Sequence, residues 1–507
     1  MTSPPDAPDA AHWPFILIVS HSLSGHLAPM IRISSALHAR GWTVYFLGPT
    51  AHASRIQFTG ATFIPLRGSA NLDDQVYYES PPVDGYNDLH WAERVMIDFR
   101  VQCLDPLPEQ WICVKAALEK LHSLDPDRQV IVLAEAFFYG ILPLQYGAPL
   151  PGKRPKTLCI SVTIPAIRSA KLPPCGYPFP FDPTPAGREL NARLWVSWKR
   201  KGAALTALLE QKMSEVGATR SVGEPFLSGA NYLCHSKILQ LGVPGFEFPR
   251  SDWPPGFRFA GLVQGKKANK DAKAISPQEE AEVKAKAKAK QPDFPWWTEL
   301  VSNSALPRQD PRRKKVVVVA QGTVETNPND LIIPTIRAFA DREDVLVVAI
   351  LGWRGAKLSL STSNLSNPDI TTTTTKNDEN DAIAESPLPA NARIADYLSY
   401  DAALSHADAW VHNGGFGAVN HGIANGVPMV VAGEGMDKTE NTRRVAWSGI
   451  GVDLRSATPG VDAVREGVGR VLREGRFPLR VAELRRESEE MDCFGIVHEE
   501  LFGLVGV

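Results

Sequence analysis

A glycine-rich segment in the last quarter of the chain constrains the fold more than any other feature. Residues 412–418 read His-Asn-Gly-Gly-Phe-Gly-Ala, and an apolar run at 409–411 comes directly before them. The apolar run predicts a short buried strand, and the glycines predict a turn into a helix. The first turn of a helix presents backbone N–H groups without intrahelical partners, and glycine lets an anion approach them closely. These residues alone are compatible with a phosphate site and with a plain strand-to-helix turn.

The residues that follow resemble the donor-binding signature of the family 1 glycosyltransferases, which move sugars from UDP-sugars onto small acceptors. Pro428 closes a Gly-Val-Pro triplet, and an acidic residue follows nine positions later. Counted back from Pro428, the family's phosphate-binding His position falls on Asn413 and not on the neighbouring His412. The resemblance implies donor-binding roles for a set of residues in this segment: Asn413, Gly414, Gly415, Gly417, Ala418, His421, Asp437 and Lys438.

Three of these positions depart from the family pattern. Asn413 replaces a His, His421 stands where a ribose-binding Glu is usual, and Lys438 stands where a sugar-binding Gln is usual. An amide and an ammonium group can both donate to phosphate oxygens, so the exchanges are compatible with donor binding. They leave the sugar unspecified.

Two further segments extend the resemblance. The apolar run 315–320 leads to Gly322-Thr323, which in similar proteins brings a hydroxyl and backbone amides to the diphosphate. Tyr397 matches the aromatic residue that stacks on uracil in the family, and Tyr400 replaces a family Gln. A flat aromatic face suits a nucleobase, although a single Tyr is more often part of a core.

The other informative segment lies near the N-terminus. Residues 15–19 form a short apolar run typical of a buried parallel strand, and Ser-Gly-His-Leu-Ala-Pro follows at 24–29. In open α/β sheets the binding crevice lies at the carboxyl ends of the strands, where His26 would stand. The residues alone favour a structural role for this His. The Gly-His-x-x-Pro context, however, resembles the family's first strand and helix, where the resemblance implies that His26 is the general base.

A general base needs a partner that fixes its tautomer and stabilises the imidazolium. Similar enzymes use an Asp at the end of a later strand, and the run 130–138 has that pattern with Glu135 at the position. Glu is one methylene longer than Asp. The alternative for Glu135 is a solvated carboxylate at a strand end.

Composition agrees with a globular enzyme and excludes some classes. The chain has 507 residues, 44% of them hydrophobic and 22% charged, and a formal net charge of -2. This charge gives no field that would favour nucleic acid. The six cysteines show no metal-ligand spacing, and no apolar run has the length of roughly 20 residues that a membrane span needs. We therefore expect a cytoplasmic protein with no membrane span, no metal and no cofactor.

The order of patterns along the chain predicts two α/β domains. We expect a flexible N-terminus at 1–12 and an acceptor-binding Rossmann-like domain at 13–262. A low-complexity linker would follow at 263–292, then a UDP-sugar-binding Rossmann-like domain at 293–478, with a disordered, dispensable insert at 358–385. A final helix at 479–507 would cross back onto the first domain.

The resemblance implies a GT-B fold, in which two Rossmann-like domains with parallel sheets face each other. The pattern is closest to fungal and bacterial UDP-glucosyltransferases of small lipophilic molecules. We expect an inverting hexosyltransferase that moves a sugar, most simply glucose, from a UDP-sugar to an acceptor hydroxyl. Two other classes stay open: a non-catalytic nucleotide-sugar-binding or scaffold protein of the same fold, and a dinucleotide oxidoreductase. The second fits less well because the glycine turn lacks the third glycine of Gly-x-Gly-x-x-Gly.

Overall fold

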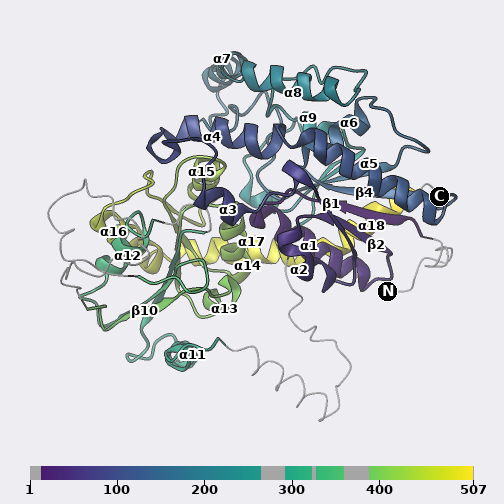
Figure 1. The fold of residues 1–507 in the computed structure, drawn as a ribbon. Helices are drawn as coiled ribbons and strands as arrows, with labels where there is room; N and C mark the ends of the chain where they lie inside the picture. The colour runs from purple at the N-terminus through teal and green to yellow at the C-terminus, as the bar shows by residue number, and fades with distance from the viewer. Residues whose placement is uncertain (1–12, 178, 264–291, 323–326, 359–386, 506–507) are drawn as a thin grey trace, which may run out of the picture. The chain divides into compact units, whose positions relative to one another are not determined.

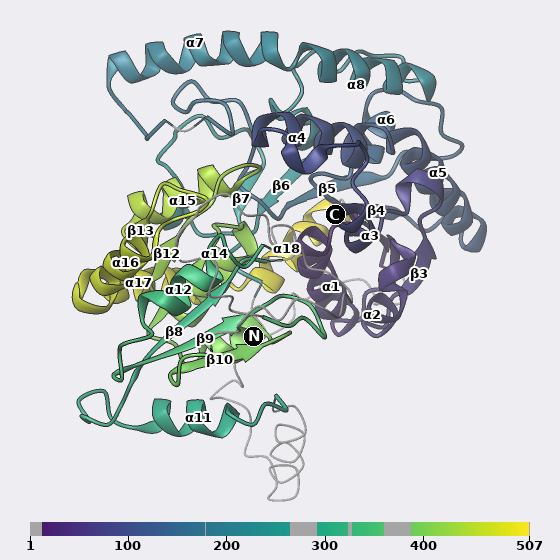
Figure 2. The same cartoon turned by 60° about the vertical axis from the view of Figure 1, so that its left-hand side comes forward.

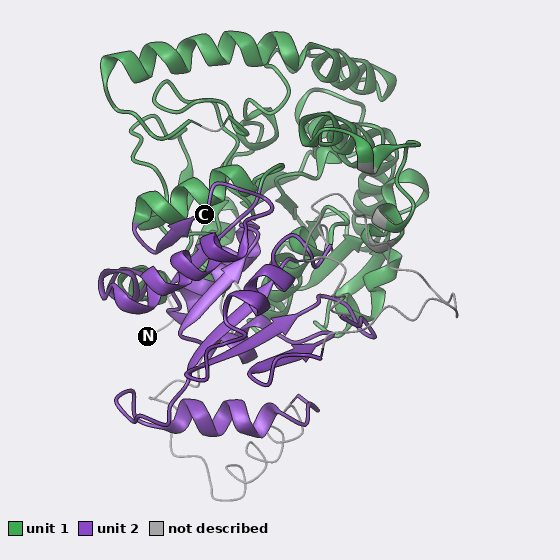
Figure 3. Cartoon of the chain, turned by 90° about the vertical axis from the view of Figure 1, so that its left-hand side faces the viewer, with its two compact units in different colours: residues 1–265, 434–448, 483–507 green, residues 266–433, 449–482 purple. Residues whose placement is uncertain are grey.

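A computed structural model describes residues 13–263, 292–322, 327–358 and 387–505, apart from residue 178. The predicted N-terminal extension, most of the linker, the insert and Thr323 lie outside the described residues. The chain divides into two compact units (Figure 3). Unit 1 comprises residues 1–265, 434–448 and 483–507, and unit 2 comprises residues 266–433 and 449–482.

Unit 1 is built on a parallel sheet of seven strands in the order β3-β2-β1-β4-β5-β6-β7 (Figure 1). Its strands are β1 (Phe15–Val19), β2 (Val44–Gly48), β3 (Thr62–Pro65), β4 (Val130–Glu135), β5 (Lys156–Ser161), β6 (Lys237–Gln240) and β7 (Phe257–Phe259). Its helices are α1 (Ser24–His38), α2 (Ala53–Gln57), α3 (Asp74–Glu79), α4 (Trp91–Phe99), α5 (Leu107–Leu124), α6 (Leu142–Gln145), α7 (Pro185–Lys201), α8 (Ala203–Glu215), α9 (Ala230–Leu233), α15 (Lys438–Ser448) and α18 (Cys493–Val505). A π-helical turn, η5 (Arg100–Leu104), joins α4 to the start of α5.

The central strands of unit 1 are apolar on both faces because helices cover both. Ile16 and Ile18 of β1 pack with α1, α2 and α18, whereas Leu17 and Val19 point to the other face and pack with α5. Helices α7 and α8 lie outermost, beyond α4 and α5 (Figure 1, Figure 2). The predicted strands at 15–19 and 130–135 are therefore confirmed as the centre of a three-layered α/β unit.

Unit 2 repeats this plan with six parallel strands in the order β10-β9-β8-β11-β12-β13. Its strands are β8 (Lys315–Ala320), β9 (Val345–Ile350), β10 (Ala392–Ala395), β11 (Ala409–His412), β12 (Met429–Val431) and β13 (Gly451–Asp453). Its helices are α11 (Trp297–Ala305), α12 (Ile332–Ala338), α13 (Tyr400–Leu404), α14 (Phe416–Asn425) and α16 (Val461–Arg473), and α17 (Arg476–Met491) begins in unit 2 and ends in unit 1.

Helices α12 and α16 cover one face of the second sheet, where valines of β8, β9, β11 and β12 form the core. The other face carries Trp410, whose indole packs on Tyr400 of α13 and donates to the carbonyl of Ala418 in α14. In both units the strand order reverses beside the first strand, between β1 and β4 and between β8 and β11. Loops at such a reversal leave a crevice at the carboxyl ends of the strands, so these two places are where ligands are expected. No helix within the described ranges is both long enough and apolar enough to cross a membrane.

Candidate active site

In unit 1 the reversal of strand order between β1 and β4 brings His26 and Glu135 together. Glu135 is the last residue of β4, and His26 lies in the first turn of α1, seven residues after β1 ends at Val19. The Nδ1 atom of His26 lies 2.9 Å from Oε1 of Glu135. Because neither residue is near the other in sequence, only the pairing of β1 with β4 places them in contact. Helix α1 begins at Ser24, so His26 is held on a helix and not on a loop.

The pair is buried on one side and open on the other. The side chain of Glu135 is fully buried, whereas 18% of the His26 side chain is exposed. The backbone N–H of Phe137 also donates to Oε1 of Glu135, at 3.0 Å, which fixes the carboxylate. The ring of Phe137 packs edge-on against His26. The imidazole is thus oriented from behind while part of it faces solvent.

The charges of the two residues support each other. Burial alone would lower the pKa of His26, but the charge of Glu135 and the hydrogen bond to it raise the pKa above its ordinary value, and Asp437 adds to this. Burial alone would raise the pKa of Glu135, but the same contact with His26 lowers it. Glu135 is therefore ionised at neutral pH and stabilises the imidazolium of His26. This arrangement can accept a proton at the second ring nitrogen, Nε2.

Asp437 and Lys438 lie in unit 1, whereas the sequence places them in the second domain. Asp437 directly precedes α15 and Lys438 is its first residue, and α15 is held by a buried ion cluster centred on Arg444. The guanidinium of Arg444 contacts Glu247 at 2.6 Å and Glu440 at 2.7 Å. Glu247 is 197 residues away in sequence, so no local pattern could reveal this contact. The carboxylate of Asp437 accepts from the amide of Asn441 at 3.0 Å.

In unit 2 the corresponding reversal places two glycine turns side by side. Gly322 follows β8 and Gly414 follows β11, and both have a φ of 83°, a left-handed conformation that favours glycine. The side-chain amide of Asn413 donates to the carbonyl of Gln321 and so ties the two turns together. The neighbouring Thr323 lies outside the described residues. Asn413 is 7% exposed at this point.

Helix α14 begins directly after these turns. Gly415 is its N-cap residue, and no side chain caps the first turn by a hydrogen bond. A side chain added at Gly417 would meet nothing within 4 Å, so the first turn is open on that side. The backbone N–H groups of Gly417 and Ala418 have no intrahelical acceptor in a first turn. Together with the positive end of the helix, they form a suitable anion site.

His412 points away from this turn. It is 1% exposed, its ring stacks on Trp410, and its Nδ1 accepts from the backbone N–H of Gly414 at 3.1 Å. Burial lowers the pKa of His412 to about 3, so the ring is neutral. The two neighbours therefore differ in environment, because Asn413 reaches the adjacent turn whereas His412 is packed in the core.

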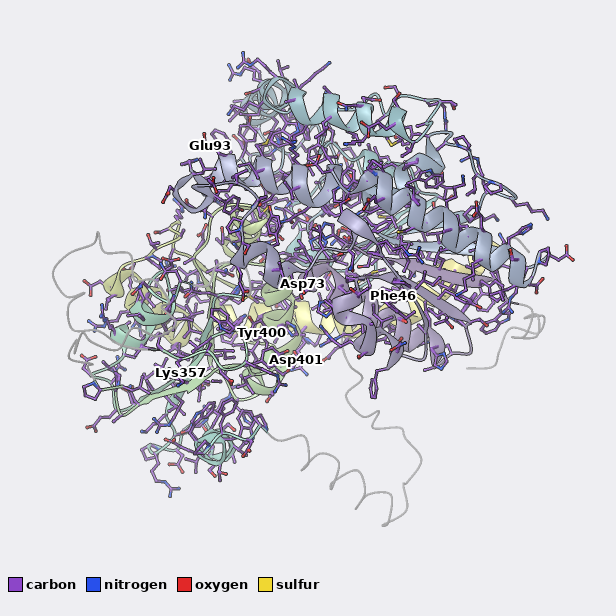
Figure 4. All side chains as sticks on the ribbon, viewed as in Figure 1. Phe46, Asp73, Glu93, Lys357, Tyr400 and Asp401 are labelled. Atoms are coloured by element: carbon purple, nitrogen blue, oxygen red, sulfur yellow. The ribbon has the colours of Figure 1, made fainter. Side chains whose placement is uncertain are left out.

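Three more predicted residues of unit 2 lie on α13, on α14 and just before them. Tyr400 begins α13 beside Asp401 (Figure 4), and its ring packs edge-on against His421 of α14. His421 Nδ1 lies 2.6 Å from Oδ1 of Asp401. Tyr397 is 52% exposed, and the guanidinium of Arg354 lies 5.4 Å from the centre of its ring. Tyr397 thus offers an accessible aromatic surface, whereas Tyr400 packs against its neighbours.

Sequence analysis missed several residues of these sites, because no motif marks them. One is His21, which is buried beside His26. Another is Asp401, the partner of His421. The ion cluster of Arg444 depends on its contact with Glu247, which the fold brings close from 197 residues away. Only the polar residue at a strand end, a pattern shared by His21 and Glu135, could have drawn attention to His21 beforehand.

Comparison with known proteins identifies the family of this chain. Residues 364–499 match the profile described as the C-terminal domain of erythromycin biosynthesis protein CIII-like proteins. The chain is 31% identical over 495 residues to UDP-glucosyltransferase 1 of Beauveria bassiana (strain ARSEF 2860), covering 96% of this chain and 94% of that protein. It is 29% identical over 494 residues to UDP-glucosyltransferase A1 of Starmerella bombicola, covering 97% and 92%. It is also 30% identical over 498 residues to 4'-demethylrebeccamycin synthase of Lentzea aerocolonigenes, covering 97% and 99%.

Solved structures give the same fold. The glycotransferase of kitacinnamycin superposes with a TM-score of 0.62 at 21% identity, covering 97% of this chain and 99% of that one. The glycosyltransferase VinC, in complex with dTDP, gives a TM-score of 0.53 at 16% identity, covering 97% and 99%. The two parallel sheets and these likenesses confirm the predicted GT-B class. The chain therefore belongs to the family 1 glycosyltransferases, and it is a UDP-dependent glycosyltransferase.

Proposed function

We propose that this enzyme transfers glucose from UDP-glucose to a hydroxyl of a small lipophilic acceptor, with inversion at the anomeric carbon and with His26 as the general base. The observation that carries the proposal is the contact of His26 with the buried Glu135, 2.9 Å between Nδ1 and Oε1. A base that must take a proton from a hydroxyl needs this kind of partner.

In the proposed reaction Nε2 of His26 takes the acceptor proton as the acceptor oxygen attacks the anomeric carbon. Glu135 stabilises the imidazolium that forms. The attack comes from the face opposite the diphosphate, so the bond to UDP breaks as the new glycosidic bond forms and the configuration inverts. Negative charge grows on the leaving UDP, and donors in fixed positions would stabilise it: Asn413 and the amides of Gly417 and Ala418. Thr323, which lies outside the described residues, is a further expected donor. The scheme uses no metal and no cofactor.

The donor assignment is supported by the relatives that are named UDP-glucosyltransferases. In this scheme Tyr397 stacks on the uracil, His421 and Tyr400 line the ribose side, and the hydroxyls of the sugar bind Asp437 and Lys438. The exposed face of Tyr397 and the uncapped start of α14 support these roles.

The acceptor assignment is supported by a cavity in unit 1. Its volume is about 30 Å³, close to that of one water molecule, so its lining and not its size supports the assignment. Its wall is mainly apolar and aromatic, with Phe179, Phe181, Trp195 and Phe248 among the lining residues. The loop that starts the wall, at Ile164, follows β5, the neighbour of the strand that carries Glu135. A lipophilic molecule fits such a lining better than a sugar or a peptide.

The test is a transfer assay with purified enzyme. UDP-glucose and other UDP-sugars are offered with a panel of phenols, sterols and polyketides, and products are identified by mass spectrometry and by the anomeric coupling constant. We expect a β-glucoside from the α-linked donor. An α-linked product would disprove inversion, and a sugar other than glucose would correct the donor.

The alternative is a non-catalytic nucleotide-sugar-binding protein of the same fold. The substituted positions Asn413, His421 and Lys438 would suit it equally well. Binding of UDP without transfer to any acceptor in the panel would favour this alternative.

The six cysteines form no disulfide, which supports the proposal that the enzyme works in the reducing cytoplasm.

A further inference from the structure

His21 is a buried histidine that the reaction scheme does not use. It follows β1, and only 2% of it is exposed. Its Nδ1 accepts from the backbone N–H of Leu23 at 3.2 Å, and its Nε2 lies 3.0 Å from the carbonyl oxygen of Gln102. Its ring centre lies 5.3 Å from that of His26. His21 therefore bridges two backbone segments next to the proposed base.

These two contacts define the state of the ring. Nδ1 accepts from an N–H group and carries no proton, so Nε2 carries it and donates to Gln102. Burial, and then the charge of His26, lower the pKa of His21 to about 4, although Glu135, the Gln102 carbonyl and Asp74 act in the opposite direction. The ring is neutral at the pH where His26 would work. His21 therefore carries no positive charge that would compete with His26 for the carboxylate of Glu135.

The carbonyl of Gln102 is an acceptor because of an irregular helix. Gln102 lies in the π-helical turn η5, where the N–H of Asp105 donates to the carbonyl of Arg100 at 2.8 Å. Four residues after Gln102 stands Pro106, which has no N–H to give the usual α-helical hydrogen bond. His21 supplies a donor to this carbonyl. Such π-helical turns occur often at functional sites.

Leu23, the other partner, determines where α1 starts. It is the N-cap residue of α1, and its carbonyl accepts from the N–H groups of His26 at 3.0 Å and Leu27 at 2.9 Å. The side chain of Leu23 is a hydrocarbon and cannot accept a capping hydrogen bond. The hydrogen bond from Leu23 to His21 therefore fixes the residue on which the first turn, with His26, is built.

We propose that His21 is a positioning residue, which aligns the first turn of α1 so that His26 meets Glu135. The inference rests on the proposed function, in which His26 is the base. The groups that face His21 are His26 on α1, Glu135 on β4, Asp74 on α3 and the Gln102 carbonyl on η5.

The experiment compares two variants of the full-length enzyme. His21→Ala removes both hydrogen bonds. His21→Asn keeps one, because an Asn side chain accepts readily from the N–H two residues ahead, as His21 does from Leu23. The matched control is His498→Ala in α18. It removes a partly buried His whose Nδ1 accepts from the indole N–H of Trp42 at 2.9 Å.

For His21→Ala we expect kcat to fall by about 10- to 100-fold, as for a small misplacement of a catalytic group, with the acceptor KM little changed. His21→Asn should recover part of this loss. His498→Ala should lower the melting temperature but leave kcat unchanged. If His21→Ala loses only thermal stability, as the control does, His21 is a structural residue and the inference is wrong.

A second measurement separates this inference from the proposed function. NMR titration of ¹⁵N-histidine-labelled enzyme reports the pKa of His26 without any substrate. In His21→Ala we expect this pKa to fall from its raised value towards the ordinary one, because the contact with Glu135 is loosened. An unchanged His26 titration would overturn the positioning role. Retained activity in His26→Ala would instead overturn the proposed function and leave the NMR result standing.

Discussion

The two units place different chemistry at the same point of the same topology. In each, the strand order reverses beside the first strand, and two strand ends become neighbours. In unit 1 the neighbours are a histidine and a buried carboxylate, His26 and Glu135. In unit 2 they are two glycine turns joined by the amide of Asn413. The topology fixes where a ligand can bind, and the side chains at the strand ends decide whether the site can move a proton or hold an anion.

A second pair of residues sharpens the comparison. His21 in unit 1 and His412 in unit 2 each accept, through Nδ1, from the backbone N–H two residues ahead. Both are buried and neutral, with pKa values of about 4 and about 3. They differ at the other nitrogen. Nε2 of His21 reaches the Gln102 carbonyl, whereas Nε2 of His412 is buried without a hydrogen-bond partner among the described residues.

The largest expected effect separates the two sites by function. His26→Ala removes the proposed base of unit 1 and should lower kcat by roughly 10²- to 10⁴-fold. UDP binding, which we assign to unit 2, should stay nearly unchanged. Steady-state kinetics and calorimetry with UDP measure the two effects separately. If UDP binding were lost together with activity, His26 would belong to the donor site or support the fold.

The next effect concerns the charge beside the base. His26 acts as a base only when neutral, and its pKa is raised by Glu135. The kcat/KM of the wild-type enzyme should therefore fall as the pH is lowered through a value above 6.5. Glu135→Gln removes the charge, so the pKa of His26 drops and this acidic limb moves to lower pH. The rate above the limb should fall by about 10- to 100-fold, because the imidazolium loses its partner.

A pH–rate profile of both proteins makes the measurement. Glu93→Gln on α4 is a suitable control, because Glu93 is a carboxylate of the same unit outside the proposed site. A limb at the same pH in wild-type enzyme and in Glu135→Gln would mean that His26 is not the group that titrates.

Substitutions in the donor turn of unit 2 should change UDP affinity and leave the pH dependence of the reaction unchanged. If Asn413 holds a diphosphate oxygen, Asn413→Ala should weaken UDP binding by roughly 1.5 to 3 kcal/mol, the usual range for a hydrogen bond to a charged group. Asn413→His restores the residue that is usual in the family and should keep much of the affinity. Calorimetry with UDP gives both values. A shift of the acidic limb in either variant would contradict the division of labour between the two units.

The parts of this comparison that the sequence could predict are local. The apolar runs at 15–19, 130–138, 315–320 and 409–411 each contain or form part of a strand, because short apolar runs bounded by turn residues suit a parallel strand covered on both faces. The two chain reversals follow from the α/β alternation. Both predicted sites therefore stand at strand ends.

The parts that could not be predicted depend on contacts between distant residues. The grouping of α15 with unit 1 rests on Arg444 and Glu247, and the role of His21 rests on a carbonyl made available by Pro106 and a π-helical turn. Hydrophobic patterns carry no information about such contacts.

The smallest expected effect tests the register of the donor turn. His412→Ala should leave UDP affinity nearly unchanged, because the ring is buried against Trp410 and faces the core. It should still cost about 1 kcal/mol of folding stability, since the N–H of Gly414 loses its acceptor. His412→Asn can keep that hydrogen bond and should recover the stability. Calorimetry and thermal unfolding measure the two quantities. If UDP binding were crippled in His412→Ala and unaffected in Asn413→Ala, the count back from Pro428 would be wrong by one residue, and the donor roles of His421, Gly417 and Ala418 would be lost with it.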